Sequence, residues 1–287
     1  ALERPQIHAM ATVQQSGYVV IGTDSGLHGV QLDENSYQDA HWDTELPSTE
    51  VTSLMSDPVN GVWVGTYRGI SLFTSSSMLV RSAEREPLLK SIMSITTESK
   101  LGTILATYDQ LLLHTSSSSH ETSLPNSVPE SIRTEGQIMA TASSVDEVIV
   151  GYRAAGLTRY NTHSGQTTRY SETSAPNLSS NRVSALLIAS TGDLYVGTYG
   201  GGVNIVKDNN TIDKIRSSDP KSTLPSDNVI LLTEDSRGRI WLGTEAGLVR
   251  FDPKTSSFRQ VHIYTDGAAQ NFVAWCLALT SSGKLLA

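Results

Sequence analysis

The sequence of 287 residues contains a single cysteine, Cys276. An intrachain disulfide and a zinc site built on several cysteines are therefore both excluded. The shortage also argues against a small secreted domain held together by disulfides, and it fits either the cytosol or a bacterial periplasm. Because Cys276 follows Trp275 in an apolar segment, we expect a buried and unreactive thiol.

Charge is also scarce, since charged residues make up 17% of the chain and the net charge is −8. A surface of this sign repels phosphate backbones, so we expect no nucleic-acid partner. The sequence shows no cluster of Lys and Arg that would favour binding to an anionic membrane surface.

Long apolar runs are absent, because none reaches ten residues, and about 20 are needed to span a bilayer as a helix. The first residues do not have the pattern of a signal peptide. The chain does not begin with Met, which is typical of a processed protein or a fragment of a longer one.

No segment has a sustained 3.6-residue apolar period, so we expect very little helix. What the sequence does contain is a repeated strand of β-branched and aromatic residues that ends in Gly-Thr or a variant and is followed by a turn. The six copies cover residues 19–26, 62–69, 103–109, 148–156, 194–201 and 240–247.

The copies recur at nearly constant spacing. The anchor positions, Gly22, Gly65, Ala106, Gly151, Gly197 and Gly243, are separated by 43, 41, 45, 46 and 46 residues. This period is typical of a four-stranded propeller blade. A β-sandwich has no reason to repeat at this interval, and a β-helix coil is usually much shorter. The sequence predicts an all-β fold, a β-propeller of about seven four-stranded blades forming one domain over residues 1–287.

The seventh blade is predicted to be incomplete. First strands are expected to begin near residues 6, 51, 91, 137, 183, 229 and 273, and residues 283–287 match residues 238–242 of the preceding unit. The third and fourth strands of the last unit have no counterpart in the sequence. We therefore expect this chain to be a fragment of a longer receptor, with a thin seventh blade as the alternative.

The repeat resembles the two-component regulator propeller repeat. An apolar strand and a turn with Asp and Gly are followed by an aliphatic residue, Trp, Gly-Thr and then Gly-Leu with an aromatic residue. Residues 238–252 are the best copy, and the segments before Val183 and Val229 also fit. The resemblance covers essentially the whole chain, although the copy at Ala106 departs from the pattern.

This resemblance implies the periplasmic sensor region of a bacterial membrane receptor, such as a hybrid histidine kinase or a receptor coupled to a diguanylate cyclase. It implies a small-molecule or oligosaccharide ligand, a membrane-anchored parent chain and signal transduction by an output domain outside this chain. A homodimer is compatible with it. The sequence itself shows no membrane helix and no output domain.

Catalytic motifs are lacking. The seven histidines are scattered over different blades without metal-ligand spacing, and neither a Gly-x-Ser-x-Gly elbow nor a phosphate-binding loop is present. We expect no catalytic residues, no metal and no cofactor, and we expect this chain not to be an enzyme. Trp63 and Trp241 occupy the same strand position in their blades and are expected to pack between sheets.

One set of residues is the candidate ligand site. The residue two positions after each anchor lies in the turn between the second and third strands, and such turns gather on one face of a propeller. Tyrosine rings stack on sugars, while hydroxyl and guanidinium groups make polar contacts. Asp24 stands at this position in the first repeat, Tyr152 stands one position earlier in its blade, and Arg68 follows Tyr67 as a second cation. The predicted ligand-binding residues are Tyr67, Arg68, Tyr108, Tyr152, Arg153, Tyr199 and Glu245. The alternative is that the tyrosines only cap the ends of the blades.

Three functions remain open at this stage. The first is an extracytoplasmic ligand-sensing domain of a two-component-type receptor. The second is a protein-interaction scaffold that uses the same face, and the third is a propeller enzyme such as a polysaccharide lyase. They differ in what they bind and in whether substrate is consumed.

Overall fold

The computed structural model describes most of the chain. The described residues are 6–13, 18–32, 37–41, 46–57, 61–74, 79–82, 92–98, 102–107, 111–114, 122–123, 136–265, 268–270, 273, 275–279 and 285–286. Every regular element in these ranges is a β-strand, which confirms the expected all-β fold for the described part of the chain.

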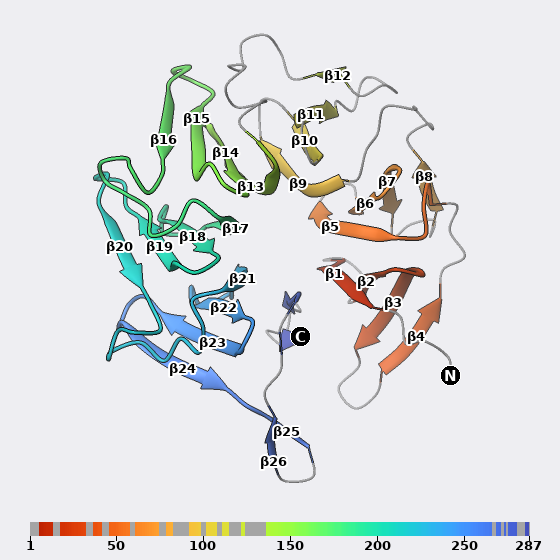
Figure 1. Cartoon of the computed structure of the whole chain (residues 1–287). Helices are drawn as coiled ribbons and strands as arrows, with labels where there is room; N and C mark the ends of the chain where they lie inside the picture. The colour runs from red at the N-terminus through yellow and green to blue at the C-terminus, as the bar shows by residue number, and fades with distance from the viewer. Residues whose placement is uncertain are drawn as a thin grey trace. The chain divides into compact units, whose positions relative to one another are not determined.

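The strands form six four-stranded antiparallel sheets, each with its strands in sequence order. We call these sheets blades 1 to 6 (Figure 1). Blade 1 comprises β1 (Ile7–Thr12), β2 (Tyr18–Thr23), β3 (Gly26–Leu32) and β4 (Tyr37–His41). Blade 2 comprises β5 (Val51–Asp57), β6 (Gly61–Thr66), β7 (Gly69–Thr74) and β8 (Leu79–Ser82). Blade 3 comprises β9 (Ile92–Glu98), β10 (Gly102–Thr107), β11 (Leu111–His114) and β12 (Thr122–Ser123).

Blades 4 to 6 follow the same order. Blade 4 comprises β13 (Ile138–Ser144), β14 (Glu147–Tyr152), β15 (Leu157–Asn161) and β16 (Thr167–Tyr170). Blade 5 comprises β17 (Val183–Ile188), β18 (Leu194–Thr198), β19 (Gly202–Val206) and β20 (Ile212–Ile215). Blade 6 comprises β21 (Val229–Glu234), β22 (Ile240–Thr244), β23 (Gly247–Asp252) and β24 (Ser257–Val261). Two further strand pairs are β25 (Ile263–Thr265) with β26 (Ala268–Gln270), and β27 (Ala278–Leu279) with β28 (Leu285–Leu286).

The chain divides into two compact units. Unit 1 is Ala1–Thr97, Leu101–Leu124 and Cys276–Ala287 and holds blades 1 to 3, and unit 2 is Glu98–Lys100 and Pro125–Trp275 and holds blades 4 to 6. Neighbouring blades pack through their first strands, β1 against β5 in unit 1, and β13 against β17 and β17 against β21 in unit 2. That one propeller domain spans residues 1–287 stays a prediction.

The predicted number of blades is corrected. The described residues form six four-stranded blades rather than about seven, and the place of the seventh is taken by the two-stranded pair β27–β28. Its first strand was expected to begin near Val273, but the paired strand begins at Ala278. Val273 is 39% exposed, and the match of residues 283–287 with 238–242 makes it the counterpart of Asn228, which lies just before the first strand of blade 6. Val273 therefore occupies the position just before a first strand rather than the first position within it.

The structure explains why both the glycine and the threonine of the Gly-Thr motif recur in the blades. A Cβ atom on the anchor glycine would meet the first residue of the next blade, as Gly197 would meet Val229 Cγ1 at 2.9 Å, so glycine lets adjacent sheets approach closely. The threonine hydroxyl donates a hydrogen bond across the following turn, from Thr66 to the carbonyl of Gly69 and from Thr198 to that of Gly202, both at 2.9 Å. These threonines are fully buried.

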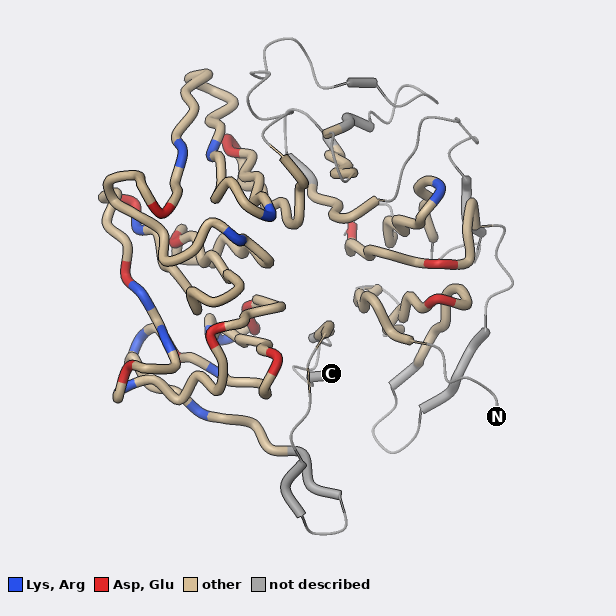
Figure 2. Tube along the Cα trace, in the orientation of Figure 1, with Lys and Arg blue, Asp and Glu red and all other residues tan. Residues whose placement is uncertain are grey.

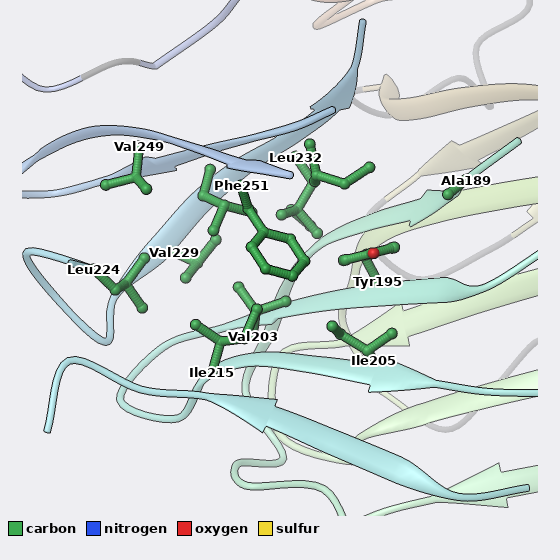
Figure 3. Close-up of a cluster of buried hydrophobic side chains, with 13 residues drawn as sticks. Ala189, Tyr195, Val203, Ile205, Ile215, Leu224, Val229, Leu232, Val249 and Phe251 are labelled. Carbon is green, nitrogen blue, oxygen red and sulfur yellow. The ribbon is translucent and has the colours of Figure 1, made fainter. Parts of the chain in front are cut away.

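The hydrophobic core lies between adjacent blades rather than inside any one of them. Between blades 5 and 6, side chains of β18 and β19 pack against those of β21 and β23 (Figure 3). The best-buried members of this cluster are Tyr195, Val203, Val229, Ile240, Leu242 and Val249. Because each sheet contributes one face to the core, a blade is stable only when a neighbour covers it.

The two tryptophans at the same strand position are both buried. Trp63 and Trp241 are 7% and 9% exposed, and each indole Nε1 donates to an aspartate at 3.1 Å, Asp57 in blade 2 and Asp235 in blade 6. Blade 5 has Tyr195 at the corresponding strand position. Trp63 packs against Ile92, Ile95 and Leu105 of blade 3, which confirms the prediction that it packs between sheets. For Trp241 the structure shows burial, and packing between sheets stays a prediction.

Candidate functional site

The turns that carry the predicted ligand residues are built in the same way in five blades. The turn residue two positions after the anchor glycine donates its backbone N–H to the carbonyl of the residue just before the first strand, which we call the lead-in residue. The bonds run from Asp24 to Gln6, Tyr67 to Glu50, Arg153 to Gln137, Tyr199 to Arg182 and Glu245 to Asn228, at 2.9–3.3 Å.

We call this end of each blade the lead-in/turn edge. Just inside it, the pairing of the first and second strands shifts register, as between Val51 and Ser53 in blade 2 and between Val183 and Ala185 in blade 5. Such a shift bends the strand and redirects its side chains. Each edge therefore presents two side chains together, one from the lead-in residue and one from the turn residue.

In unit 2 these two side chains interact with each other. Arg153 Nη1 donates to Gln137 Oε1 at 3.0 Å. The Arg182 guanidinium lies 5.2 Å from the centroid of the Tyr199 ring, within the range of a cation–π contact. In blade 6, Asn228 Nδ2 donates to Glu245 Oε2 at 2.6 Å.

The edges of neighbouring blades in unit 2 are also joined. Gly156 N donates to the carbonyl of Asn181 at 2.9 Å, linking blade 4 to blade 5. Gly200 N donates to Asn228 Oδ1 at 2.8 Å, linking blade 5 to blade 6. The predicted residues Arg153, Tyr199 and Glu245 therefore lie along one continuous rim.

In unit 1 the edge of blade 2 is different. It forms an open cavity of about 500 Å³ lined by Pro47, Ser48, Thr49, Glu50, Tyr67 and Arg68. The side chain of Tyr67 is 55% exposed, and Arg68 and Glu50 are exposed beside it. Among the described residues, the side chains of Tyr67 and Arg68 have no hydrogen-bond or ion-pair partner. This edge offers an aromatic ring, a guanidinium and a carboxylate to a ligand.

Two of the predicted site residues do not join these edges. Tyr152 is fully buried, because it ends β14 at the position that Thr66 occupies in blade 2, where the side chain points into the core. A ligand at the surface cannot contact its side chain, so Tyr152 is withdrawn from the site. Tyr108 lies outside the described residues.

The lead-in residues were missed by the sequence analysis. Glu50, Gln137, Arg182 and Asn228 share no residue type, so no motif identifies them. They do stand 14 or 15 residues before their anchor glycines, and this nearly constant offset could have indicated that they share one edge with the turns.

Among the residues that the structure describes, no group of three or more His, Cys, Asp or Glu is placed to hold a metal ion. Burial raises the pKa of the Cys276 thiol to about 11, which keeps it protonated at neutral pH. In the described ranges, no helix is long and apolar enough to cross a bilayer.

Comparison with protein families identifies the repeat. The model described as "Two component regulator propeller" matches residues 45–68, 177–200 and 223–246. Each match contains a complete lead-in/turn edge, those of blades 2, 5 and 6. No curated protein matches the chain.

Comparison with solved structures supports the fold. The extracellular domain of BT3049, described as a hybrid two-component system of B. thetaiotaomicron, superposes with a TM-score of 0.76 at 14% identity, covering 97% of this chain and 38% of that one. The extracellular domain of BT4673 from B. thetaiotaomicron, described as a one-component system, has a TM-score of 0.53 at 14% identity over 98% and 44%. This chain therefore spans less than half the length of either domain.

An enzyme shares the architecture as well. An inactive variant of virginiamycin B lyase from Staphylococcus aureus, crystallised with quinupristin, superposes with a TM-score of 0.67 at 15% identity, covering 94% of this chain and 88% of the lyase. Identities this low establish the fold alone. Together with the family match, they show that the chain is an all-β propeller in which residues 45–68, 177–200 and 223–246 match the two-component regulator propeller repeat.

Proposed function

We propose that this chain is an extracytoplasmic ligand-sensing domain of a two-component-type receptor and that the edge of blade 2 is its principal ligand contact. The family match and the two similar extracellular domains support the receptor class and the location. The single observation that supports the site is the open cavity beside Tyr67, Arg68 and Glu50.

The chemistry of that cavity favours a polar ligand with a flat apolar face, such as an oligosaccharide. The Tyr67 ring can stack on a sugar, and Arg68 and Glu50 can donate and accept hydrogen bonds at its hydroxyls. Ser48 and Thr49 line the same cavity with two further hydroxyl groups. A cavity of about 500 Å³ is in the size range of small-molecule sites.

Signalling then requires that the ligand bind one conformation of the receptor better than another. The side chains along the continuous rim of unit 2 are paired with one another. We therefore assign the rim the role of holding neighbouring blades in place rather than of binding the ligand. The output domain and the membrane anchor belong to the parent receptor in this proposal.

The test is a thermal-shift and calorimetric screen of the chain against oligosaccharides and small anions. A ligand that binds the native state raises its melting temperature by mass action. We expect a hit that Tyr67→Ala and Arg68→Gln each weaken at least tenfold. Val145→Ala, at an exposed position in the turn between β13 and β14, is the matched control and should bind like the parent chain.

The same screen separates the alternatives. The lyase comparison favours an enzyme as the second candidate, and products released from a bound oligosaccharide would support it against a sensor. A folded chain that binds no small ligand would contradict the proposed function and leave a protein-interaction scaffold.

A further inference from the structure

A cluster of guanidinium groups lies on one face of blade 6. Trp241, Arg250 and Arg259 are register partners on β22, β23 and β24, so their side chains point to the same side of the sheet. Directly opposed residues in a sheet have Cβ atoms about 4.5–5.5 Å apart. Arg239 precedes Trp241 by two residues and is therefore on the same face.

The corresponding positions in blades 4 and 5 carry opposite charges. The position compared is that of Arg239, two residues before Trp241 in blade 6. In blade 4 this position is occupied by Glu147, whose carboxylate forms an ion pair with Arg159 at 2.9 Å. Blade 5 has Asp193, which bonds Lys207 at 2.9 Å. Blade 6 has Arg239 at this position. Arg159 of blade 4 is the counterpart of Arg250, so the acid that neutralises this third-strand cation in blade 4 is replaced by a further cation in blade 6.

The acids of blade 6 offset the positive charge at Arg250 only in part. The Asp235 carboxylate is taken by Arg239, whose Nε and Nη2 both lie 2.7 Å from Oδ2, and by the Trp241 indole. Among the described residues, neither Arg250 nor Arg259 has an ion pair. Burial, followed by repulsion from Arg239 and Arg259, lowers the pKa of Arg250, although Asp235 and Asp252 act in the opposite direction.

Like charges opposed across two strands destabilise a sheet, and the chain as a whole is acidic, with a net charge of −8. Along the described chain, Lys and Arg lie mainly on blades 4 to 6 (Figure 2). Arg259 is exposed and Arg250 is half-buried, so a ligand can reach both groups from solvent. Adjacent guanidinium groups fit the planar or tetrahedral oxygens of one anion.

We propose that Arg250 and Arg259 hold one oxyanion group, a sulfate, phosphate or carboxylate, on the face of blade 6. The anion takes the place that the carboxylate of Glu147 fills beside Arg159 in blade 4. This site lies on a sheet face and does not include the lead-in/turn edges. The proposal of an anion site therefore does not depend on the proposed function.

The test compares sodium sulfate, phosphate and acetate with chloride at matched ionic strength. Sulfate stabilises many proteins by exclusion from their surfaces. Specific binding is therefore judged from the difference in Tm response between the parent chain and its variants. We expect a saturable rise in Tm of about 2–4 °C, lost in both Arg250→Gln and Arg259→Gln. Lys214→Gln, which removes an exposed cation from the outer strand of blade 5, should keep the full rise.

A further variant supplies the missing acid within the chain. Arg259→Glu places a carboxylate opposite Arg250, and we expect a higher Tm in chloride with no response to the three oxyanions. An equal response in the parent chain and all variants, or no saturable response in the parent chain, would overturn the proposal. A response to acetate alone would identify a carboxylate as the natural group, and a response to sulfate and phosphate a tetrahedral one.

Discussion

Blade 2 and blade 5 share one backbone arrangement at their lead-in/turn edges but use it differently. In both, the N–H of a turn tyrosine, Tyr67 or Tyr199, bonds the carbonyl of the lead-in residue. In blade 5 the lead-in side chain, Arg182, covers the tyrosine ring. In blade 2 the tyrosine is left exposed over an open cavity. The repeat therefore sets the framework, and two side chains per blade decide whether the edge is closed or available.

The largest expected effect concerns the anchor glycines. A Cβ on Gly65 would meet Ile92 Cγ2 at 2.8 Å and Ile92 Cβ at 2.9 Å, whereas at Gly197 only one atom lies within 3.0 Å. We expect Gly65→Ala to destabilise by about 2–3 kcal/mol and Gly197→Ala by about 1 kcal/mol. Chemical denaturation of each variant checks this, and equal losses would show that the two blade interfaces are equally tight.

The threonines should behave alike in the two blades. Thr66→Val and Thr198→Val keep the side-chain shape but leave a carbonyl oxygen of a buried turn without its donor. We expect each to cost about 1–2 kcal/mol of unfolding free energy. A large difference between them, measured by urea denaturation, would mean that the shared framework is less uniform than the hydrogen bonds indicate.

Acid should act on blade 6 through Asp235. Burial alone would raise the pKa of Asp235, but hydrogen bonds from Arg239 and Trp241 lower it from 3.8 to about 2. Because the folded pKa lies below the unfolded one, this carboxylate stabilises the fold fully above pH about 4, and the stabilisation is lost as the pH falls toward 2. We expect a contribution of about 1–2 kcal/mol.

Asp235→Asn should remove this contribution, so that the variant is less stable at neutral pH and its unfolding free energy changes less between pH 4 and pH 2. Denaturation curves of both proteins over that range check it. If the two pH profiles are parallel, Asp235 is not the responsible group.

The smallest expected effect concerns the tyrosines as structural elements. Tyr199→Ala removes the contact with Arg182 and should cost about 0.5–1 kcal/mol. Tyr67→Ala removes an exposed ring and should change the unfolding free energy by less than about 0.5 kcal/mol. Paired urea titrations measure the difference, and a larger loss at Tyr67 would mean that this tyrosine serves packing.

Much of this organisation could be predicted from the sequence. The spacing of the anchor glycines predicted the blades, and the turn positions of Tyr67, Arg68, Arg153, Tyr199 and Glu245 are where the pattern placed them. These features follow from local strand and turn chemistry, which repeats along the chain and is visible in one sequence.

The features that the sequence analysis predicted wrongly or missed depend on contacts that no local sequence pattern encodes. The burial of Tyr152 depends on its standing where other blades have threonine. The lead-in residues are brought to the turns by hydrogen bonds between positions 17 to 18 residues apart in four of the five blades. Each of these is decided by tertiary contacts rather than by residue type.

The most direct test of the central claim is to measure the affinity of one screened ligand for the parent chain, Tyr67→Ala and Tyr199→Ala by calorimetry. If the open edge of blade 2 is the ligand contact, Tyr67→Ala lowers affinity at least tenfold, while Tyr199→Ala changes it less than twofold. If Tyr199→Ala abolishes binding and Tyr67→Ala does not, the closed rim of unit 2 is the site and the account given for blade 2 is wrong.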